Sequence, residues 1–137
     1  MTPFRQRVVA TEAMNAKYGD KVKFTIIYTI EAHPVSSPCP YSGKEWTSSA
    51  STDKEGNPLT QPETYQERVE QATKMIMELG ISVPVLIDEI DNPVWCTYGP
   101  APNIAYLIGT DGTIIAKQGW YQPEEMRSAI ATYLGTK

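Results

Sequence analysis

Histidine and cysteine are scarce in this sequence. Among 137 residues there is one histidine, His33, and two cysteines, Cys39 and Cys96, which form no CxxC pair. A zinc site built from these residue types needs about four ligands, so the sequence predicts no metal site. A G-x-S-x-G segment is also lacking, which argues against a serine hydrolase of the α/β type.

Positive charge and long apolar runs are lacking as well. Lys and Arg total 12 against 16 Asp and Glu, a net charge of −4, and the sequence pI is about 5.0. A nucleic-acid binder needs clustered cations, so this class of protein is not expected. No apolar run approaches the ~20 residues of a membrane span, and the polar first 20 residues do not read as a signal peptide. We expect a soluble, cytoplasmic chain with no membrane segment.

The overall composition is that of a folded domain. Hydrophobic residues make up 41% and charged residues 20%, an ordinary globular balance. The length predicts one domain over residues 1–137. Residues 34–62 are rich in Pro, Ser and Thr, which predicts a long loop inserted after a core strand. Loops of this length in compact domains are usually functional or mobile.

Apolar periodicity and turn signals predict an alternating order of helices and strands. Helices are expected at 2–18, 63–79 and 123–134, strands buried on both faces at 22–30 and 83–87, an irregular stretch at 92–102, and a hairpin around Thr110-Asp111-Gly112. This order is typical of an α/β, thioredoxin-like three-layer sandwich. Such a fold opens with a central strand, and this chain lacks it because its first predicted helix begins at residue 2.

The end of the first predicted strand carries the residues of greatest chemical interest. Glu31 and His33 follow the apolar run of that strand directly. Ligands of open α/β sheets bind at the carboxyl ends of strands, and an acid with an imidazole can hold and move protons. Because the two residues are two apart, we expect them on one face, with Glu31 orienting the ring. A surface histidine in a loop is the alternative.

A second candidate feature is the proline-rich turn that precedes the hairpin. Thioredoxin-like domains carry a cis-proline at the position of Pro102, and its geometry turns the backbone toward an extended substrate. We therefore expect Pro102, Asn103 and Tyr98 to contact substrate, with an ordinary trans proline as the alternative. Nearby aromatic side chains could line the same pocket or complete the core. They are Trp95, Trp120 and Tyr121.

Several segments together carry a family resemblance. They are Pro3-Phe4-Arg5, Tyr18 to Val22, Glu-Ala-His-Pro at 31–34, Gln61 to Thr64 with Glu67-Arg68, Val85 to Asn92, and Tyr98-Gly99 leading to Tyr106 to Ile108. The chain resembles the iodothyronine deiodinase family, including its bacterial deiodinase-like members, over nearly its whole length.

This resemblance implies a thioredoxin-fold oxidoreductase. The family places a selenocysteine or cysteine directly before Pro-Phe, where a helix N-terminus lowers the pKa of the nucleophile. Its Glu-Ala-His motif supports proton delivery in reductive dehalogenation, a role that here falls to Glu31 and His33. The implied partners are a small-molecule substrate of the halogenated aromatic class and an external thiol reductant, with no bound cofactor. A homodimer is left open.

The sequence also departs from the family pattern. Met1 and Thr2 occupy the nucleophile position, so we expect no redox activity from this chain and a truncation after its Sec or Cys nucleophile. A longer loop with Glu45-Trp46 replaces the family's Asp-Gly-Trp, and a second histidine is lacking, so thyroid hormone is not the expected substrate. Cys39 is a candidate resolving thiol, and Cys96 a weaker one.

Two alternative functions stay open. A peroxiredoxin-like thiol peroxidase would pair a Thr and a Cys at the first helix with a nearby Arg. Thr2 and Arg5 match that pattern without its cysteine. The other alternative is a non-catalytic thioredoxin-like binding module.

Overall fold

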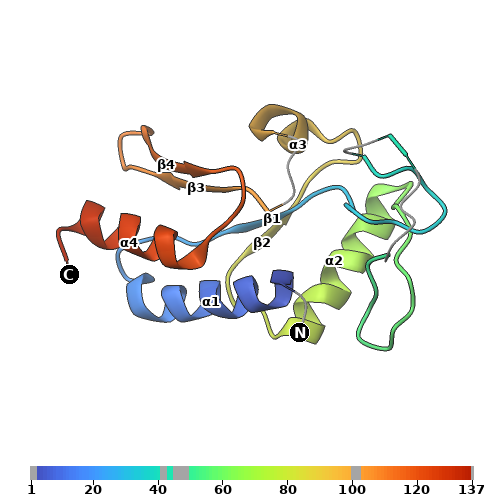
Figure 1. Cartoon of the computed structure of the whole chain (residues 1–137), viewed down its shortest axis with the longest axis horizontal. Helices are drawn as coiled ribbons and strands as arrows, with labels where there is room; N and C mark the ends of the chain where they lie inside the picture. Colours follow the sequence, from blue (N-terminus) through green and yellow to red (C-terminus); the bar gives the residue numbers. More distant parts are fainter. Residues whose placement is uncertain (1–2, 41–42, 45–49, 100–102, 137) are drawn as a thin grey trace. The chain divides into compact units, whose positions relative to one another are not determined.

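The computed structural model describes residues 3–40, 43–44, 50–99 and 103–136. Within these residues the chain is an α/β protein of four helices and four short strands (Figure 1). Their order is α1 (Pro3–Tyr18), β1 (Ile26–Tyr28), α2 (Tyr65–Leu79), β2 (Val85–Ile87), α3 (Pro93–Tyr98), β3 (Ala105–Ile108), β4 (Ile114–Gln118) and α4 (Pro123–Leu134). Two compact units result, one formed by residues 1–24 with 101–137 and the other by residues 25–100.

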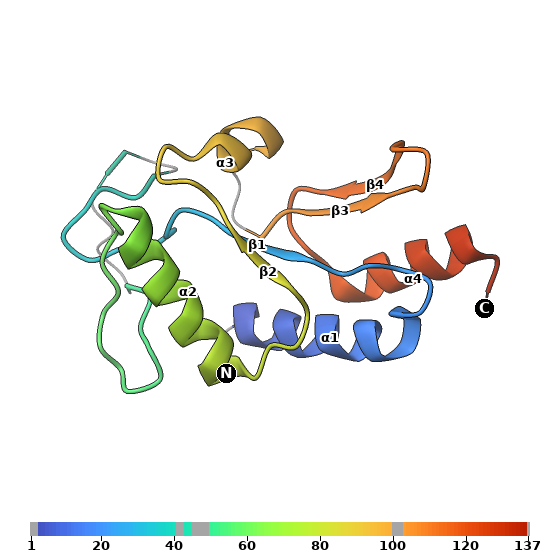
Figure 2. The ribbon, with the colours of Figure 1, turned by 180° about the vertical axis from the view of Figure 1, so that it is seen from behind.

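The first unit packs α1 and α4 with the antiparallel hairpin β3–β4 (Figure 2). The hairpin turns at Asp111-Gly112, where Gly112 adopts a φ of 84° and the Asp111 carboxylate accepts a hydrogen bond from the Thr113 amide at 2.9 Å. Glycine tolerates this left-handed backbone without a Cβ clash. The buried core of the unit consists of Met14, Tyr18, Leu107, Met126 and Ile130.

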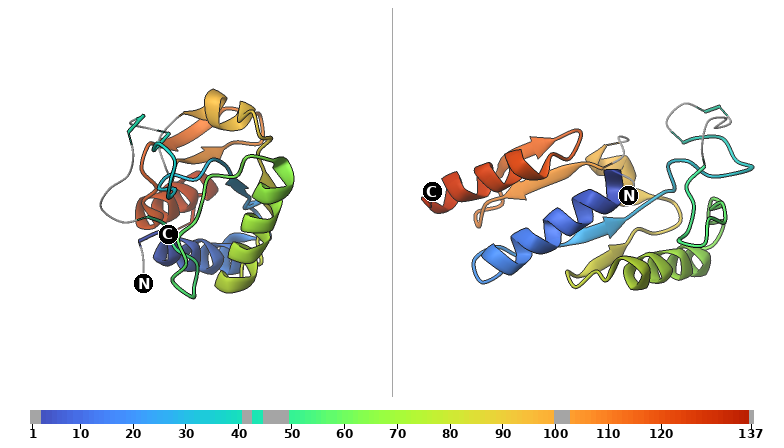
Figure 3. Two further views of the ribbon diagram at one scale, coloured as in Figure 1. Left: turned by 90° about the vertical axis from the view of Figure 1, so that its right-hand side faces the viewer. Right: turned by 60° about the horizontal axis from the view of Figure 1, so that its bottom comes forward.

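The second unit contains the parallel pair β1–β2, in which Ile26 lies opposite Val85 and Tyr28 opposite Ile87. Helix α2 connects these strands and packs against β2 (Figure 3). It begins with a capping box at Thr64, and ends at Gly80 in the left-handed conformation. Both caps satisfy backbone groups that a helix end leaves unpaired.

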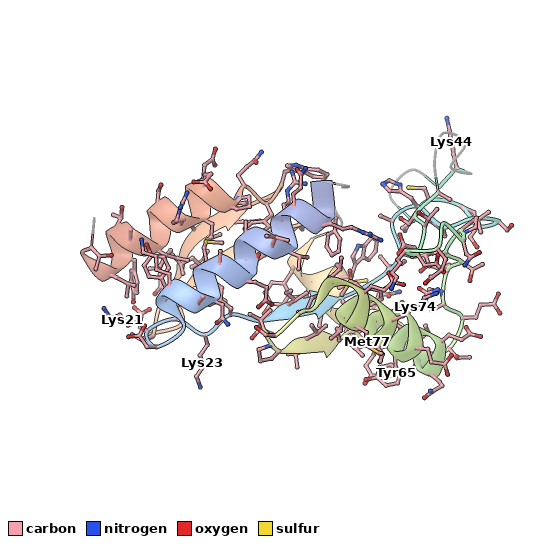
Figure 4. All side chains as sticks on the ribbon, turned by 90° about the horizontal axis from the view of Figure 1, so that it is seen from below. Lys21, Lys23, Lys44, Tyr65, Lys74 and Met77 are labelled. Atoms are coloured by element: carbon pink, nitrogen blue, oxygen red, sulfur yellow. The ribbon has the colours of Figure 1, made fainter. Side chains whose placement is uncertain are left out.

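The loop after β1 is fastened to the second unit by backbone hydrogen bonds. The Ser51 amide donates to the carbonyl of His33 at 2.9 Å, the Leu59 amide to Ser51 at 2.8 Å, and the Val35 amide to Leu59 at 2.8 Å. Lys74 extends from α2 (Figure 4), and its Nζ donates to the Asp53 carboxylate at 2.6 Å. The described part of the loop is thus built onto the end of β1 and onto α2.

The observed structure confirms the predicted α/β class, the three long helices and the hairpin. The predicted strands at 22–30 and 83–87 were too long, since three residues of each form a ladder. Their burial on both faces was also wrong, because Ile27 is 43% exposed and Leu86 56% exposed. Within the stretch predicted to be irregular, Pro93–Tyr98 forms α3, because proline is well suited to the first turn of a helix.

The four described strands form two separate two-stranded sheets. Within the described residues, β1 pairs with β2, β3 pairs with β4, and no strand joins the two pairs. The order of helices and strands is consistent with a thioredoxin-like α/β fold. None of the helices described is long and apolar enough to cross a membrane.

Candidate functional site

Glu31 lies three residues beyond β1 and is held by its backbone. The Glu31 amide donates to Gln61 Oε1 at 2.9 Å, and Gln61 Nε2 donates to the Glu31 carbonyl at 3.0 Å. One side chain therefore satisfies both backbone groups of Glu31, as a neighbouring strand would. Gln61 fixes the point at which the chain leaves the sheet.

The carboxylate of Glu31 is held at one of its two oxygens. Oε1 accepts a hydrogen bond from Ser51 Oγ at 2.8 Å and another from the backbone amide of His33 at 3.2 Å. The two predicted site residues thus lie together, and their hydrogen bond runs from the His33 amide to the carboxylate. Both residues are half-buried, so they combine a fixed geometry with access to solvent.

Tyr28 lies at the end of β1, next to this acid. Its hydroxyl donates to Gln71 Oε1 on α2 at 3.3 Å. Burial raises the pKa of the Tyr28 hydroxyl far above its usual value, and the negative charge of Glu31 raises it further, while the Arg68 guanidinium opposes both effects. Tyr28 is therefore a neutral hydrogen-bonding group at neutral pH.

Arg68 is a buried cation that connects α2 with the carboxyl end of β2. With 1% of its surface exposed, it donates from Nη1 to the carbonyls of Asp88 at 3.1 Å and Glu89 at 2.6 Å. Burial lowers the pKa of its guanidinium, and the negative charge of Asp88 raises it. Burial has the larger effect, so the pKa of the guanidinium lies below its usual value.

Asp88 in turn begins α3. Its carboxylate accepts hydrogen bonds from the amides of Val94 at 3.1 Å and Trp95 at 2.9 Å. These amides belong to the first turn of α3, which has no other intrahelical acceptors for them. Arg68 and Asp88 together fix α2, the end of β2 and α3 as one supporting layer.

The remaining predicted site residues are spread along the chain. Cys39 is buried, with 2% of its surface exposed, whereas Cys96 on α3 is exposed, and neither forms a disulfide. Tyr98 ends α3 in the second unit and is 47% exposed. Asn103 belongs to the first unit, where it has a φ of 57° and its carbonyl accepts the Tyr121 amide at 2.6 Å. Pro102 lies outside the described residues.

Positions 1 and 2, where the family resemblance expects the nucleophile, also lie outside the described residues. Among the described residues, no three His, Cys, Asp or Glu side chains converge so as to hold a metal ion.

Comparison with known proteins finds a distant similarity to one kind of enzyme. The chain is 27% identical to the thyroxine 5-deiodinases of Ovis aries and Bos taurus over 139 aligned residues. The alignment covers 96% of this chain, which spans about two fifths of the length of these relatives, 41% and 40% respectively. No family model matches the chain.

The similarity supports the deiodinase-like relationship that the Glu-Ala-His-Pro segment indicated. Thyroxine 5-deiodinases are by name dehalogenating enzymes, and the similarity extends over nearly all of this chain. Glu31 and His33 lie three and five residues beyond β1, and an acid with a histidine is suited to holding and moving protons.

Three residues of this region were missed by reasoning from sequence. Ser51 lies in a stretch with many Ser and Thr, so nothing distinguished it from its neighbours. Gln61 was noticed only as part of a motif before α2. Arg68 was likewise noticed only within the Glu67-Arg68 segment of the family resemblance, and its position beside the apolar stripe of α2 gives no sequence signal of burial.

Proposed function

We propose that this chain belongs to a deiodinase-like oxidoreductase in which Glu31 and His33 hold and deliver the protons of a reductive dehalogenation. The observation that carries the proposal is the anchored carboxylate of Glu31, which accepts hydrogen bonds from Ser51 and from the His33 amide. The distant similarity to thyroxine 5-deiodinases supports the same chemistry. A halogenated aromatic small molecule is the proposed substrate class.

The reaction needs a chalcogen nucleophile, a proton and a thiol reductant. A thiolate or selenolate attacks the halogen and forms a chalcogen–halogen bond, while the carbon–halogen bond breaks and its electron pair stays on the ring carbon. That carbon takes one proton. Two equivalents of an external thiol then reduce the chalcogen–halogen bond, releasing halide and a disulfide.

Glu31 and His33 fit the proton-handling part of this scheme. An imidazole changes its charge near neutral pH, and a carboxylate beside it can accept and return a proton. A carbanion-like leaving carbon requires a proton donor in the transition state, and such general acid catalysis contributes about 10²–10⁴-fold. The resemblance expects the thiol or selenol just before Pro3-Phe4, at or before Met1, and Thr2→Cys supplies a thiol next to that position.

The experiment supplies that thiol by substitution. Thr2→Cys is made together with Cys39→Ser and Cys96→Ser, and the release of iodide from an iodophenol is measured with dithiothreitol as reductant. We expect turnover that falls about 100-fold or more when Glu31→Gln or His33→Ala is added. The matched control is Glu63→Gln, an exposed carboxylate two residues before α2, which should leave the rate unchanged.

Two results would contradict the proposal. The first is a Thr2→Cys protein that releases no iodide above the thiol-only background. The second is turnover that is the same with and without Glu31 and His33. If the protein instead reduces a hydroperoxide and leaves the iodophenol intact, the peroxiredoxin-like alternative is correct, and a protein inactive on both substrates is a binding module.

A further inference from the structure

We propose that Ser51 is a positioning residue for Glu31, holding the carboxylate so that a single oxygen exchanges protons with the reaction. This inference rests on the proposed function and deepens it. It comes from a contact between residues 20 positions apart, the Ser51 hydroxyl and Glu31 Oε1, which lie 2.8 Å apart.

Ser51 and the His33 amide together occupy one oxygen of Glu31. Oε1 receives both hydrogen bonds, at 2.8 Å and 3.2 Å. Among the described residues Oε2 has no hydrogen-bond partner, so it is the oxygen left to exchange a proton. A hydroxyl that donates to a carboxylate forms a short and strong hydrogen bond, which fixes the side chain in one rotamer.

The backbone on both sides of this hydroxyl is independently fixed. The Ser51 amide donates to the His33 carbonyl at 2.9 Å, and the Ser51 carbonyl accepts the Leu59 amide at 2.8 Å. The Gln61 side chain independently holds the amide and the carbonyl of Glu31. Consequently, removing only the Ser51 hydroxyl should leave the loop in place and free the carboxylate, which separates a positioning role from a structural one.

The rate of the reaction should fall when the Glu31 carboxylate is no longer held in one orientation. A displacement of about 1 Å in a catalytic group costs about 10²-fold in rate, because the reacting atoms must be aligned. Substrate binding does not depend on the orientation of Glu31 to the same extent. We therefore expect the Ser51 hydroxyl to act on kcat and to leave KM nearly unchanged.

The test compares Ser51→Ala and Ser51→Thr in the Thr2→Cys protein that carries Cys39→Ser and Cys96→Ser. Ser51→Ala should lower kcat about 10- to 100-fold with KM within about two-fold, and Ser51→Thr, which keeps the hydroxyl, should restore most of the rate. Ser128→Ala removes a hydroxyl that donates to the Glu124 carbonyl in α4 and serves as the matched control, with no change expected.

A second measurement needs no activity. Hydrogen exchange of the His33 amide, followed by NMR in the original chain, reports whether Oε1 is still held in place. Exchange should be about 10- to 100-fold faster in Ser51→Ala and unchanged in Ser51→Thr, because removing a hydrogen bond to a charged group destabilises the arrangement by a comparable factor.

The outcomes separate this inference from the proposed function. If the Thr2→Cys protein does not turn over, the proposed function fails, and unchanged His33 exchange in Ser51→Ala would overturn the positioning of Glu31 as well. If the protein turns over and Ser51→Ala has the parent kcat, or if Ala and Thr are equally impaired, the inference is overturned while the proposed function stands.

Discussion

The buried guanidinium of Arg68 provides a quantitative test of the layer that supports the site. Arg68→Met keeps an unbranched side chain of similar reach, so the packing of the stem is largely preserved. The substitution removes two hydrogen bonds, to the carbonyls of Asp88 and Glu89, and the positive charge near the buried Asp88 carboxylate.

The expected loss of stability follows from these contacts. A hydrogen bond to a charged group contributes about 1.5–3 kcal/mol, and a buried acceptor left unpaired costs about 1–3 kcal/mol. Two carbonyls lose their donor in this variant, which corresponds to about 2–6 kcal/mol in total. Because a domain has only about 5–15 kcal/mol of stability, we expect Arg68→Met to lower the free energy of unfolding by about 3–5 kcal/mol.

Urea unfolding followed by circular dichroism measures this change. Arg68→Met is compared with Asp88→Asn and with the double variant, and the double variant should lose at least about 1 kcal/mol less than the sum of the two. Arg127→Met is the control, because Arg127 pairs with Glu124 on the exposed face of α4 and surface changes stay within about 0.5 kcal/mol. A loss below about 1 kcal/mol for Arg68→Met would refute the argument. The aliphatic part of the Arg68 side chain, which methionine retains, would then account for its contribution to stability.

Two further predictions concern the loop and α2. Hydrogen bonds from Lys74 and Asn57 lower the pKa of the Asp53 carboxyl, so its contribution to stability is complete above the unfolded pKa of about 3.9 and is lost as the pH falls toward the folded pKa. The urea midpoint of Asp53→Asn should lie below that of the original chain by a constant amount from pH 6 to pH 8, and the gap should narrow below about pH 4. A gap that stays constant down to pH 2 would contradict this. Thr64→Ala removes the capping box with Glu67 and should cost about 1 kcal/mol in urea unfolding, whereas Thr64→Ser should be close to neutral, and equal effects of the two would exclude the cap.

Local signals explain why most of the fold could be predicted from the sequence. Pro123 at the start of α4 and Asp111-Gly112 in the hairpin act through their own backbone preferences. The strands were predicted too long because a β-branched run continues past the three residues that find partners in β1 and β2. Helix α3 is not predicted because prolines and Gly99 in this stretch are typical of irregular chain, although Pro93 also suits the first turn of a helix.

The candidate site was only partly accessible from the sequence for a related reason. Glu31 and His33 could be found because they directly follow the apolar run of the predicted strand at 22–30. Ser51 and Gln61 reach Glu31 from 20 and 30 positions further along the chain, through a loop whose path depends on tertiary contacts. The burial of Arg68 depends on hydrogen bonds to carbonyls just after β2, about 20 positions further along the chain. The residues around Arg68 in the sequence do not predict such contacts.

The most direct measurement for the account as a whole is the rate of iodide release by the Thr2→Cys protein, with and without His33→Ala, at saturating iodophenol and dithiothreitol. Proton delivery by His33 and Glu31 predicts multiple turnovers in the parent and a loss of about 100-fold or more in the variant. Equal rates in the two proteins, or a parent that releases no iodide, would contradict it.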